Sequence, residues 1–354
     1  MFKQFSRFSS RMSIFQRNFS PIRSRIRYYY SNPDYYKRFN YRQDQKITFT
    51  QLLKDPTSRK YLAILFGTGS LFYITHLEEA PVSGRKRFLW IPRSLELKIG
   101  NYTYNSMLSE TGNSILPSDH PLAKKVENIF GRIVEAAQKD HTVDRSQLDG
   151  IKWKVHIVND PRAPPNAFVL PGGKVFVFSS ILNICQNDDG LATVLSHEFA
   201  HQLARHTSEN LSKAPIYSII GLVLYLVTGV ENINRLLLDS LLRMPASRQM
   251  ETEADYIGLM IMAKACFHPE ESVKLWQRMS AFEKQIGGSR SLEFLSTHPA
   301  SDRRIQNISE WLPKANNIYN ESECGIFTGY YKAFQDTIFD KNPVEPGFTY
   351  DRFQ

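Results

Sequence analysis

Two histidines and a glutamate are spaced so that they could bind and use a metal ion. They lie in the segment 196–201, SHEFAH, where apolar residues recur with the spacing of a helix that has one buried face. On such a helix His197 and His201, four positions apart, project to the same side, where two neutral imidazoles can bind one Zn²⁺. Glu198 lies beside them, and its carboxylate can take a proton from an attacking water.

A zinc ion that does chemistry needs a third protein ligand, and the segment 247–255, SRQMETEAD, offers one. On a second helix Glu251 and Asp255 share one face, whereas Glu253 is rotated away. Glu251 could bind the metal, while Asp255 could orient one of the histidines through a hydrogen bond. Alone, this segment would be interpreted as a solvated acidic face of a helix. Together with the first helix it predicts one Zn²⁺ per subunit, bound by Glu251 and the two histidines.

The elements around these residues predict an α+β fold that is mainly helical. Apolar residues repeat with helical spacing over 121–139, and the chain has a mostly helical pattern from 189 to 312. Short alternating stretches predict strands, over 87–91, 95–99, 153–158 and 175–178. We therefore expect a small β-sheet beside the metal-binding helix.

The positive charge of the chain is concentrated at its N-terminus. Residues 1–60 contain 14 Lys and Arg against three acids, whereas the remainder contains 30 against 32. A nucleic-acid-binding protein would spread its basic residues over a folded surface, so this class is excluded. The acid-free, Arg-rich and Ser-rich start is typical of a mitochondrial transit peptide, and a disordered basic tail is the alternative.

Two uncharged runs of 17 residues follow, at 61–77 and at 214–230. The first is predicted to be a transmembrane helix, with a buried hydrophobic helix as the alternative. Its basic N-terminal side would stay in the matrix, and the rest of the chain would face the intermembrane space. A full crossing by the second run would separate Glu251 from His197 by the bilayer. We therefore favour a re-entrant, membrane-resting or interior helix there.

Four motifs in the same order resemble one family of proteases. HEFAH and SRQMETEAD resemble the gluzincin family of HtpX and CaaX-prenyl-type membrane metallopeptidases. The segments NAFVLPGG at 166–173 and THPASDRRI at 297–305 also resemble that family, the latter with Ala300 where the family has proline. With the transit-like start and the predicted anchor, the chain is similar to the Oma-type inner-membrane metalloendopeptidases of mitochondria.

The resemblance implies roles for particular residues. The zinc ligands of the family correspond to His197, His201 and Glu251, and its catalytic glutamate corresponds to Glu198. The family also has a strand before the metal helix that pairs with an extended peptide through its backbone. In this chain that strand contains Asn166, Ala167 and Phe168.

Three further residues near these motifs could contribute to the site. His298 could donate a hydrogen bond to the oxyanion formed during hydrolysis, and a purely structural histidine is an equally good interpretation. Arg304 could support the site by pairing with a carboxylate such as Asp255. His206 is expected on the same helix as His197, too far along its axis to join the metal.

We therefore expect a peptidase domain over 81–320, which includes the apolar run 214–230. A transit peptide and basic linker (1–45) and a linker with the membrane helix (46–80) would precede it, and a C-terminal extension (321–354) would follow. The chain has three cysteines, too few for a disulfide scaffold. Cys266 and Cys324 could pair in the intermembrane space or remain free thiols, and Cys185 is expected in the core.

By resemblance, the protein would be a zinc endopeptidase of the mitochondrial inner membrane. It would cleave membrane proteins in quality control and stress-responsive processing, contact the lipid bilayer and form a homo-oligomer. One alternative is a catalytically inactive membrane scaffold or assembly factor that keeps the fold, which the intact Glu198 and ligand set argue against. Another is an amidase that uses the same zinc on small molecules.

Overall fold

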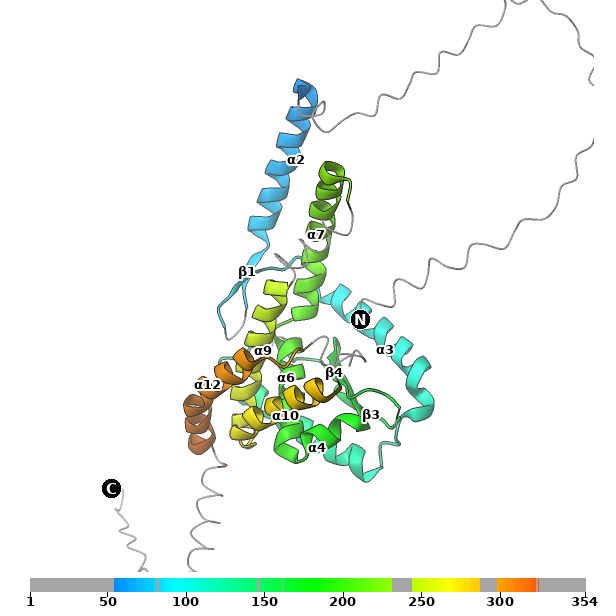
Figure 1. Ribbon diagram of the computed structural model, residues 1–354, viewed down its shortest axis with the longest axis vertical. Coiled ribbons are helices and arrows are strands. Elements are labelled where there is room, and N and C mark those ends of the chain that lie inside the picture. Colours follow the sequence, from blue (N-terminus) through cyan, green and yellow to red (C-terminus); the bar gives the residue numbers. More distant parts are fainter. Residues whose placement is uncertain are drawn as a thin grey trace, which may run out of the picture. The chain divides into compact units, whose positions relative to one another are not determined.

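The computed structural model describes residues 54–80, 83–144, 147–160, 162–230, 244–286, 298–322 and residue 324 (Figure 1). The predicted transit peptide and nearly all of the predicted C-terminal extension lie outside these ranges. The described part is mainly helical, as the sequence predicts, and contains two small sheets where the sequence predicts one. Its helices are α2 (Pro56–Thr75), α3 (Arg93–Thr111), α4 (Pro121–Lys139), α5 (Leu182–Cys185), α6 (Asp188–Leu203), α7 (His206–Thr228), α9 (Met244–Lys264), α10 (Glu270–Ile286) and α12 (Asp302–Glu321).

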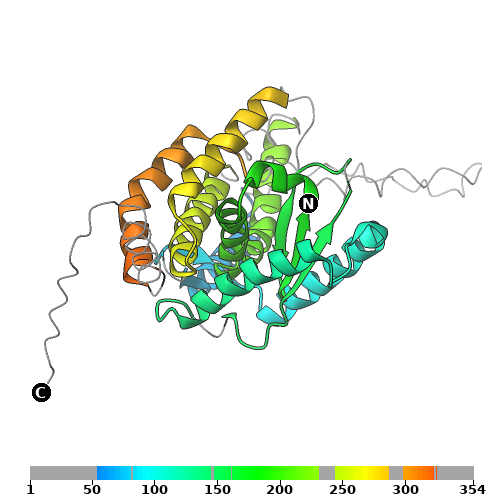
Figure 2. The ribbon, with the colours of Figure 1, turned by 90° about the horizontal axis from the view of Figure 1, so that it is seen from below.

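Helix α6 is the centre of the hydrophobic core. The side chain of Asn187 accepts a hydrogen bond from the Gly190 backbone N–H, and two acids follow in the first turn, so the helix start is well capped. Twelve of the 16 residues of α6 are buried, because α4, α9 and α10 pack around it and strand β4 contacts it as well. Figure 2 shows the sheet on one side of α6 and helices α9 and α10 on the other.

The sheet beside α6 has three strands in the order β3-β5-β4. Strand β3 (Lys154–Val158) runs parallel to β5 (Lys174–Phe178), and β4 (Ala167–Leu170) runs antiparallel to β5. The predicted strands at 153–158 and 175–178 are confirmed, as is the predicted position of the sheet. Because β4 is the last strand in this order, one of its backbone edges is not paired with another described strand.

The predicted strand at 95–99 is wrong, since these residues lie within α3. Glu96 and Gly100, four positions apart, are the buried residues of this helix, which is the spacing of one helical face. Gly100 lies so close to Pro171 that an added Cβ would be 2.0 Å from the Pro171 carbonyl oxygen. Contacts with residues distant in the sequence therefore stabilise a helix here instead of the predicted strand. Of the predicted strand at 87–91, only residues 87–88 are confirmed, within β2 (Lys86–Phe88), which pairs with β1 (Leu77–Glu79) in a hairpin.

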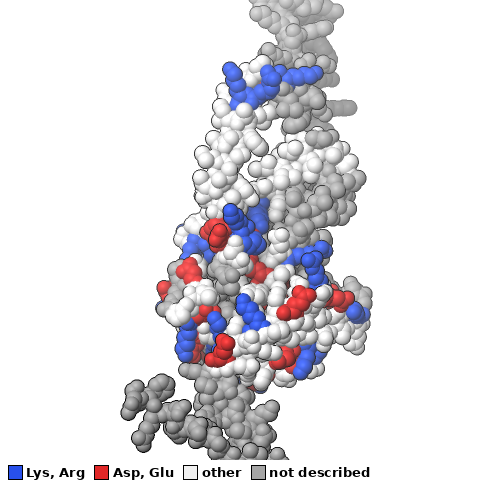
Figure 3. Space-filling model, turned by 90° about the vertical axis from the view of Figure 1, so that its left-hand side faces the viewer, with Lys and Arg blue, Asp and Glu red and all other residues white. Residues whose placement is uncertain are grey.

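The two uncharged runs form helices that leave apolar side chains in solvent. Helix α2 has no buried residue, and its only charges are Arg59 and Lys60 in its first turns. Figure 3 shows basic side chains at the far end of this helix and an uncharged surface between them and the charged surface of the domain. The second run lies in α7. Among the described residues, no helix combines the length and the hydropathy that crossing a membrane requires.

The structure settles the alternatives for the cysteines. Cys266, after α9, forms a disulfide with Cys324, after α12. Cys185 is a buried free thiol, as predicted. The disulfide joins two helices that each carry residues of the site described next.

Candidate metal centre

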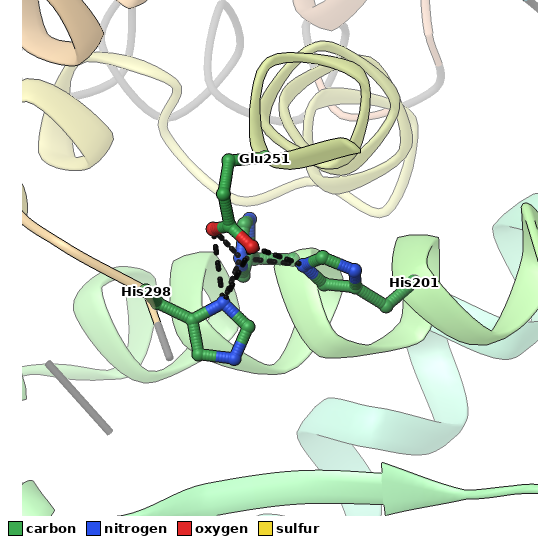
Figure 4. A group of neighbouring side chains, drawn as sticks. His201, Glu251 and His298 are labelled. Atoms are coloured by element: carbon green, nitrogen blue, oxygen red, sulfur yellow. Dashed lines mark hydrogen bonds and ion pairs between the residues drawn. The ribbon is translucent and has the colours of Figure 1, made fainter. Parts of the chain in front are cut away.

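Helices α6 and α9 bring the three predicted metal ligands together (Figure 4). On α6, the Nε2 atoms of His197 and His201 lie 3.1 Å apart. Glu251, on α9, faces both rings. Its Oε2 atom lies 3.3 Å from Nε2 of His197, and its Oε1 atom lies 3.4 Å from Nε2 of His201. The rings and the carboxylate thus converge on one point between the two helices, hereafter the metal point.

These distances fit a zinc ion. A tetrahedral zinc with bonds of about 2.0–2.1 Å separates its ligand atoms by roughly 3.3 Å. The spacing of the two Nε2 atoms and the glutamate oxygens agrees with that value. Two neutral imidazoles and one carboxylate are also donors that zinc prefers. The residues present therefore fit the predicted metal.

His298 lies closer to this point than the sequence suggests. Its Nδ1 atom is 3.2 Å from Nε2 of His197 and 2.9 Å from Oε2 of Glu251, so it belongs to the same four-residue group (Figure 4). From the sequence, His298 is expected only as a hydrogen-bond donor or a structural residue. No spacing rule relates a histidine 101 positions after His197 to the metal ligands. Its residue type was therefore the only signal in the sequence.

Glu198 lies beside this four-residue group but is not part of it. Its carboxylate is buried, and Oε1 has no hydrogen-bond partner in the described part of the chain. That oxygen lies 3.4 Å from Nε2 of His298. Burial raises the pKa of Glu198 to about 8, and the charge of Glu251 adds to the increase, whereas His197 and Arg304 oppose it.

Asp255 and Arg304 form a buried pair of opposite charges next to His197, and Nη1 of Arg304 also lies 3.3 Å from Oε2 of Glu251. Asp255 Oδ1 is 3.1 Å from His197 Nδ1, on the side of the ring away from the metal point. Arg304, on α12, donates from Nε to Oδ2 of Asp255 at 2.6 Å and from Nη2 to Oδ1 at 2.7 Å. Burial alone would raise the pKa of Asp255, but Arg304 and His197 hold it below its usual value. The guanidinium also stacks on Trp276, with Cζ 3.4 Å from the ring centroid.

The expected position of His206 on the metal helix is wrong. Arg205 adopts a left-handed conformation with φ +53°, which ends α6 and starts α7 in a new direction. His206 therefore turns back, and its Nδ1 atom lies 2.7 Å from Nδ1 of His201. Its Nε2 atom lies 3.0 Å from Oε2 of Glu253. Glu253 is directed away from the metal point, as predicted. No Gly or Pro lies at this corner, so the helical pattern of the sequence continues through it without an interruption.

The segment predicted to bind substrate lies at the edge of the three-stranded sheet. Ala167 and Phe168 are in β4, and Asn166 directly precedes it. One side of this strand is used by β5, and the Asn166 carbonyl accepts a hydrogen bond from the Phe178 N–H at 2.9 Å. The strand also contacts α6, which carries the two histidines.

A comparison with protein families matches residues 126–312 to peptidase family M48. The chain belongs to this family. It is 67% identical over 310 residues to the mitochondrial metalloendopeptidase OMA1 of Saccharomyces cerevisiae, which covers 87% of this chain and 90% of that protein. The protein of the same name from Schizosaccharomyces pombe is 41% identical over 283 residues, 79% of this chain and 80% of the relative. Human mitochondrial metalloendopeptidase OMA1 is 29% identical over 265 residues, 72% of this chain and 49% of the relative.

Membership of family M48 confirms the resemblance inferred from the four motifs. The protein is an Oma-type metalloendopeptidase, and the predicted mitochondrial location is confirmed at the level of the organelle. The family and the group of His197, His201, Glu251 and His298 support zinc as its cofactor. Neither the family nor these relatives support the inactive scaffold.

Proposed function

We propose that the protein is a zinc endopeptidase of the mitochondrial inner membrane, with His197, His201 and Glu251 as zinc ligands and Glu198 as the general base. The observation that carries this proposal is the meeting of the two imidazoles and the carboxylate of Glu251 at tetrahedral spacing, with Glu198 beside them. When bound, zinc supplies a Lewis acid that polarises the scissile carbonyl and makes water more acidic.

In this proposal Glu198 moves the protons. Its carboxylate takes a proton from the attacking water and later delivers a proton to the leaving amine. Burial raises the pKa of Glu198 to about 8, and a cation held by the neighbouring ligands would bring that pKa down towards neutrality. A group that titrates near the working pH is suited to both steps.

His298 and the pair of Asp255 and Arg304 have supporting roles in this proposal. Nε2 of His298 lies beside Glu198, whereas Nδ1 lies among the metal-ligand atoms. A catalytic zinc has one coordination position open to the substrate. For His298 to donate a hydrogen bond to the oxyanion, as proposed, its ring must face the substrate oxygen at that position. Asp255, held by Arg304, would fix the orientation of His197.

We also propose that an extended peptide pairs with the edge of β4 that no described strand occupies, along Asn166, Ala167 and Phe168. Support comes from the position of β4 at the end of the strand order and from its contact with α6. Backbone pairing gives affinity without strict selection of side chains, which is appropriate for a protease that accepts varied sequences.

The proposed membrane location rests on the charge pattern and on two exposed helices. The basic start would be the transit peptide (1–45), α2 would anchor the chain, and the peptidase domain (81–320) would face the intermembrane space. Helices α2 and α7 expose large apolar side chains to solvent, which lipid can cover. On α2 these include Tyr61, Ile64, Leu65, Phe66, Leu71 and Ile74, and on α7 they include Ile219, Leu222, Tyr225 and Leu226. Membrane proteins would then be the substrates, cleaved in quality control and stress-responsive processing by a homo-oligomer.

The test combines metal analysis with proteolysis on the purified full chain. Wild type and Glu198→Gln should each contain one zinc per chain, and only wild type should cleave an unfolded model protein. We expect the turnover of Glu198→Gln to fall by roughly 10²–10⁴-fold. A zinc chelator should stop the wild-type reaction, and added zinc should restore it. Undiminished cleavage by Glu198→Gln would contradict the role of this residue, and cleavage of small amides alone would favour the amidase.

A further inference from the structure

The side of His201 that faces away from the metal point carries a chain of polar contacts that the proposed reaction does not use. Nδ1 of His201 lies 2.7 Å from Nδ1 of His206, and Nε2 of His206 lies 3.0 Å from Oε2 of Glu253. Arg85 then donates to the same glutamate oxygen, from Nε at 3.0 Å and from Nη2 at 2.8 Å. The hydroxyl of Ser83 donates to the other oxygen of Glu253.

The proton positions in this chain follow from the role proposed for His201. If Nε2 of His201 binds zinc through its lone pair, its Nδ1 must carry the hydrogen. That N–H can donate only to an unprotonated Nδ1 of His206, so the hydrogen of His206 is on Nε2. From there it donates to the carboxylate of Glu253, which accepts and cannot donate. Each contact therefore has one donor and one acceptor.

Arg85 is the last residue in this series of contacts, and it is far from the histidines in the sequence. It directly precedes β2, in the hairpin that follows α2. Its guanidinium also donates to both oxygens of Glu209 on α7, at 2.8 and 2.6 Å. The side chains of Glu209 and Glu253 are 0% and 3% exposed, and Arg85 is 21% exposed. Arg85 is thus shared by two buried carboxylates, of which Glu209 also pairs with Lys213 at 2.5 Å, and its removal would be costly.

The same hairpin also holds the corner between α6 and α7. Arg87, in β2, donates to the backbone carbonyl of Ala204, the residue that follows α6, and pairs with Glu78 in β1. Arg205, in its left-handed conformation, pairs through Nε with Glu96 at 2.8 Å. The corner that turns His206 back towards His201 is therefore fixed by side chains from outside both helices.

We propose that His206, Glu253 and Arg85 are positioning residues that orient His201 for zinc, so that the hairpin after α2 supports the metal site. A carboxylate that binds the distal N–H of a zinc-bound histidine fixes the ring and increases its basicity. Here His206 extends that arrangement by one residue. The inference rests on the proposed function, because it needs His201 to be a zinc ligand.

The test measures zinc affinity by chelator competition and the visible spectrum of the Co²⁺-loaded full chain. Glu253→Gln and His206→Gln should weaken zinc binding by about 10–100-fold and should change the Co²⁺ spectrum, which reports ligand geometry. Arg85→Lys, which keeps the charge but lacks the forked donor, should change both readouts in the same direction by a smaller factor. It also serves as the milder variant if the buried substitutions fail to fold.

A matched control is Asp140→Asn. This carboxylate is also buried and pairs with a cation, Lys264 at 2.5 Å, but it lies outside the group of metal ligands. Its loss should lower the melting temperature and leave zinc affinity and the Co²⁺ spectrum unchanged. If the Glu253, His206 and Arg85 variants behave like this control, the inference is wrong. If His201→Ala itself binds zinc as wild type does, the proposed ligand set fails instead.

Discussion

Gly258 on α9 lies directly against the backbone of His197 on α6. A Cβ added at Gly258 would be 3.0 Å from the backbone nitrogen of His197 and 3.1 Å from its Cα. The two helices therefore touch through main-chain atoms at His197. Glu251 reaches both histidines because α6 and α9 can come this close.

Replacing Gly258 with alanine should disturb the metal site despite the better helix propensity of alanine. We expect Gly258→Ala to push the two helices apart by a few tenths of an ångström, to weaken zinc binding and to lower the melting temperature. Gly131, inside α4, is the control because an added Cβ meets no atom within 4 Å. Gly131→Ala should stabilise the protein by about 0.5–1 kcal/mol. Equal effects of the two substitutions in thermal unfolding and zinc titration would contradict this role of Gly258.

Loss of Arg304 should leave the buried charge of Asp255 without its cation, with His197 as the remaining partner. We expect Arg304→Met to reduce the free energy of unfolding by about 3–5 kcal/mol. Adding Asp255→Asn should recover part of that loss, because the orphaned charge is then removed. Chemical denaturation of the two single variants and the double variant measures the coupling. Strictly additive effects would show that the pair does not act as a unit.

Reduction of the Cys266–Cys324 disulfide should destabilise the protein. The bond joins residues 58 positions apart, and closing a loop of this size typically contributes about 2–4 kcal/mol. A reductant should therefore lower the melting temperature of wild type. It should have no such effect on the double variant Cys266→Ser, Cys324→Ser, which starts from the lower value. A wild-type melting temperature that does not respond to complete reduction would refute this prediction.

Acidification should destabilise the protein partly through His156 in β3. Burial, reinforced by the charges of Lys154 and Lys174, lowers the pKa of His156 to about 4, from about 6.5 in the unfolded chain. The folded state thus favours the neutral ring. Its contribution to stability is complete above pH 6.5 and is lost as the pH falls towards 4, because only the unfolded chain gains the proton in this window.

The variant His156→Gln isolates this contribution. Unfolding should be followed between pH 7 and 4 with zinc removed from both proteins, so that loss of the metal does not contribute. The free energy of unfolding should fall less steeply in the variant than in wild type. Parallel curves would mean that His156 titrates alike in the folded and unfolded states.

The sequence by itself determined the local parts of this protein. His197, Glu198 and His201 lie on one helix, and Glu251 and Asp255 lie on another. Which of these residues share a helix face follows from their separation in the sequence alone. The helix Pro121–Lys139 follows from its apolar period in the same way. Four motifs in order were also enough to indicate the family, since they carry the chemistry of its site.

Only the tertiary structure decided which distant groups meet. The residues at 95–99 form a helix because this conformation places Glu96 and Gly100 on one face. There Glu96 pairs with Arg205, and Gly100 packs against Pro171. The left-handed Arg205 turns His206 back onto His201, and no residue pattern marks that corner. His298, the disulfide and Arg85 reach their partners across 47 to 168 positions of chain. Such contacts depend on how helices pack against one another, and periodicity along the chain contains no information about that packing.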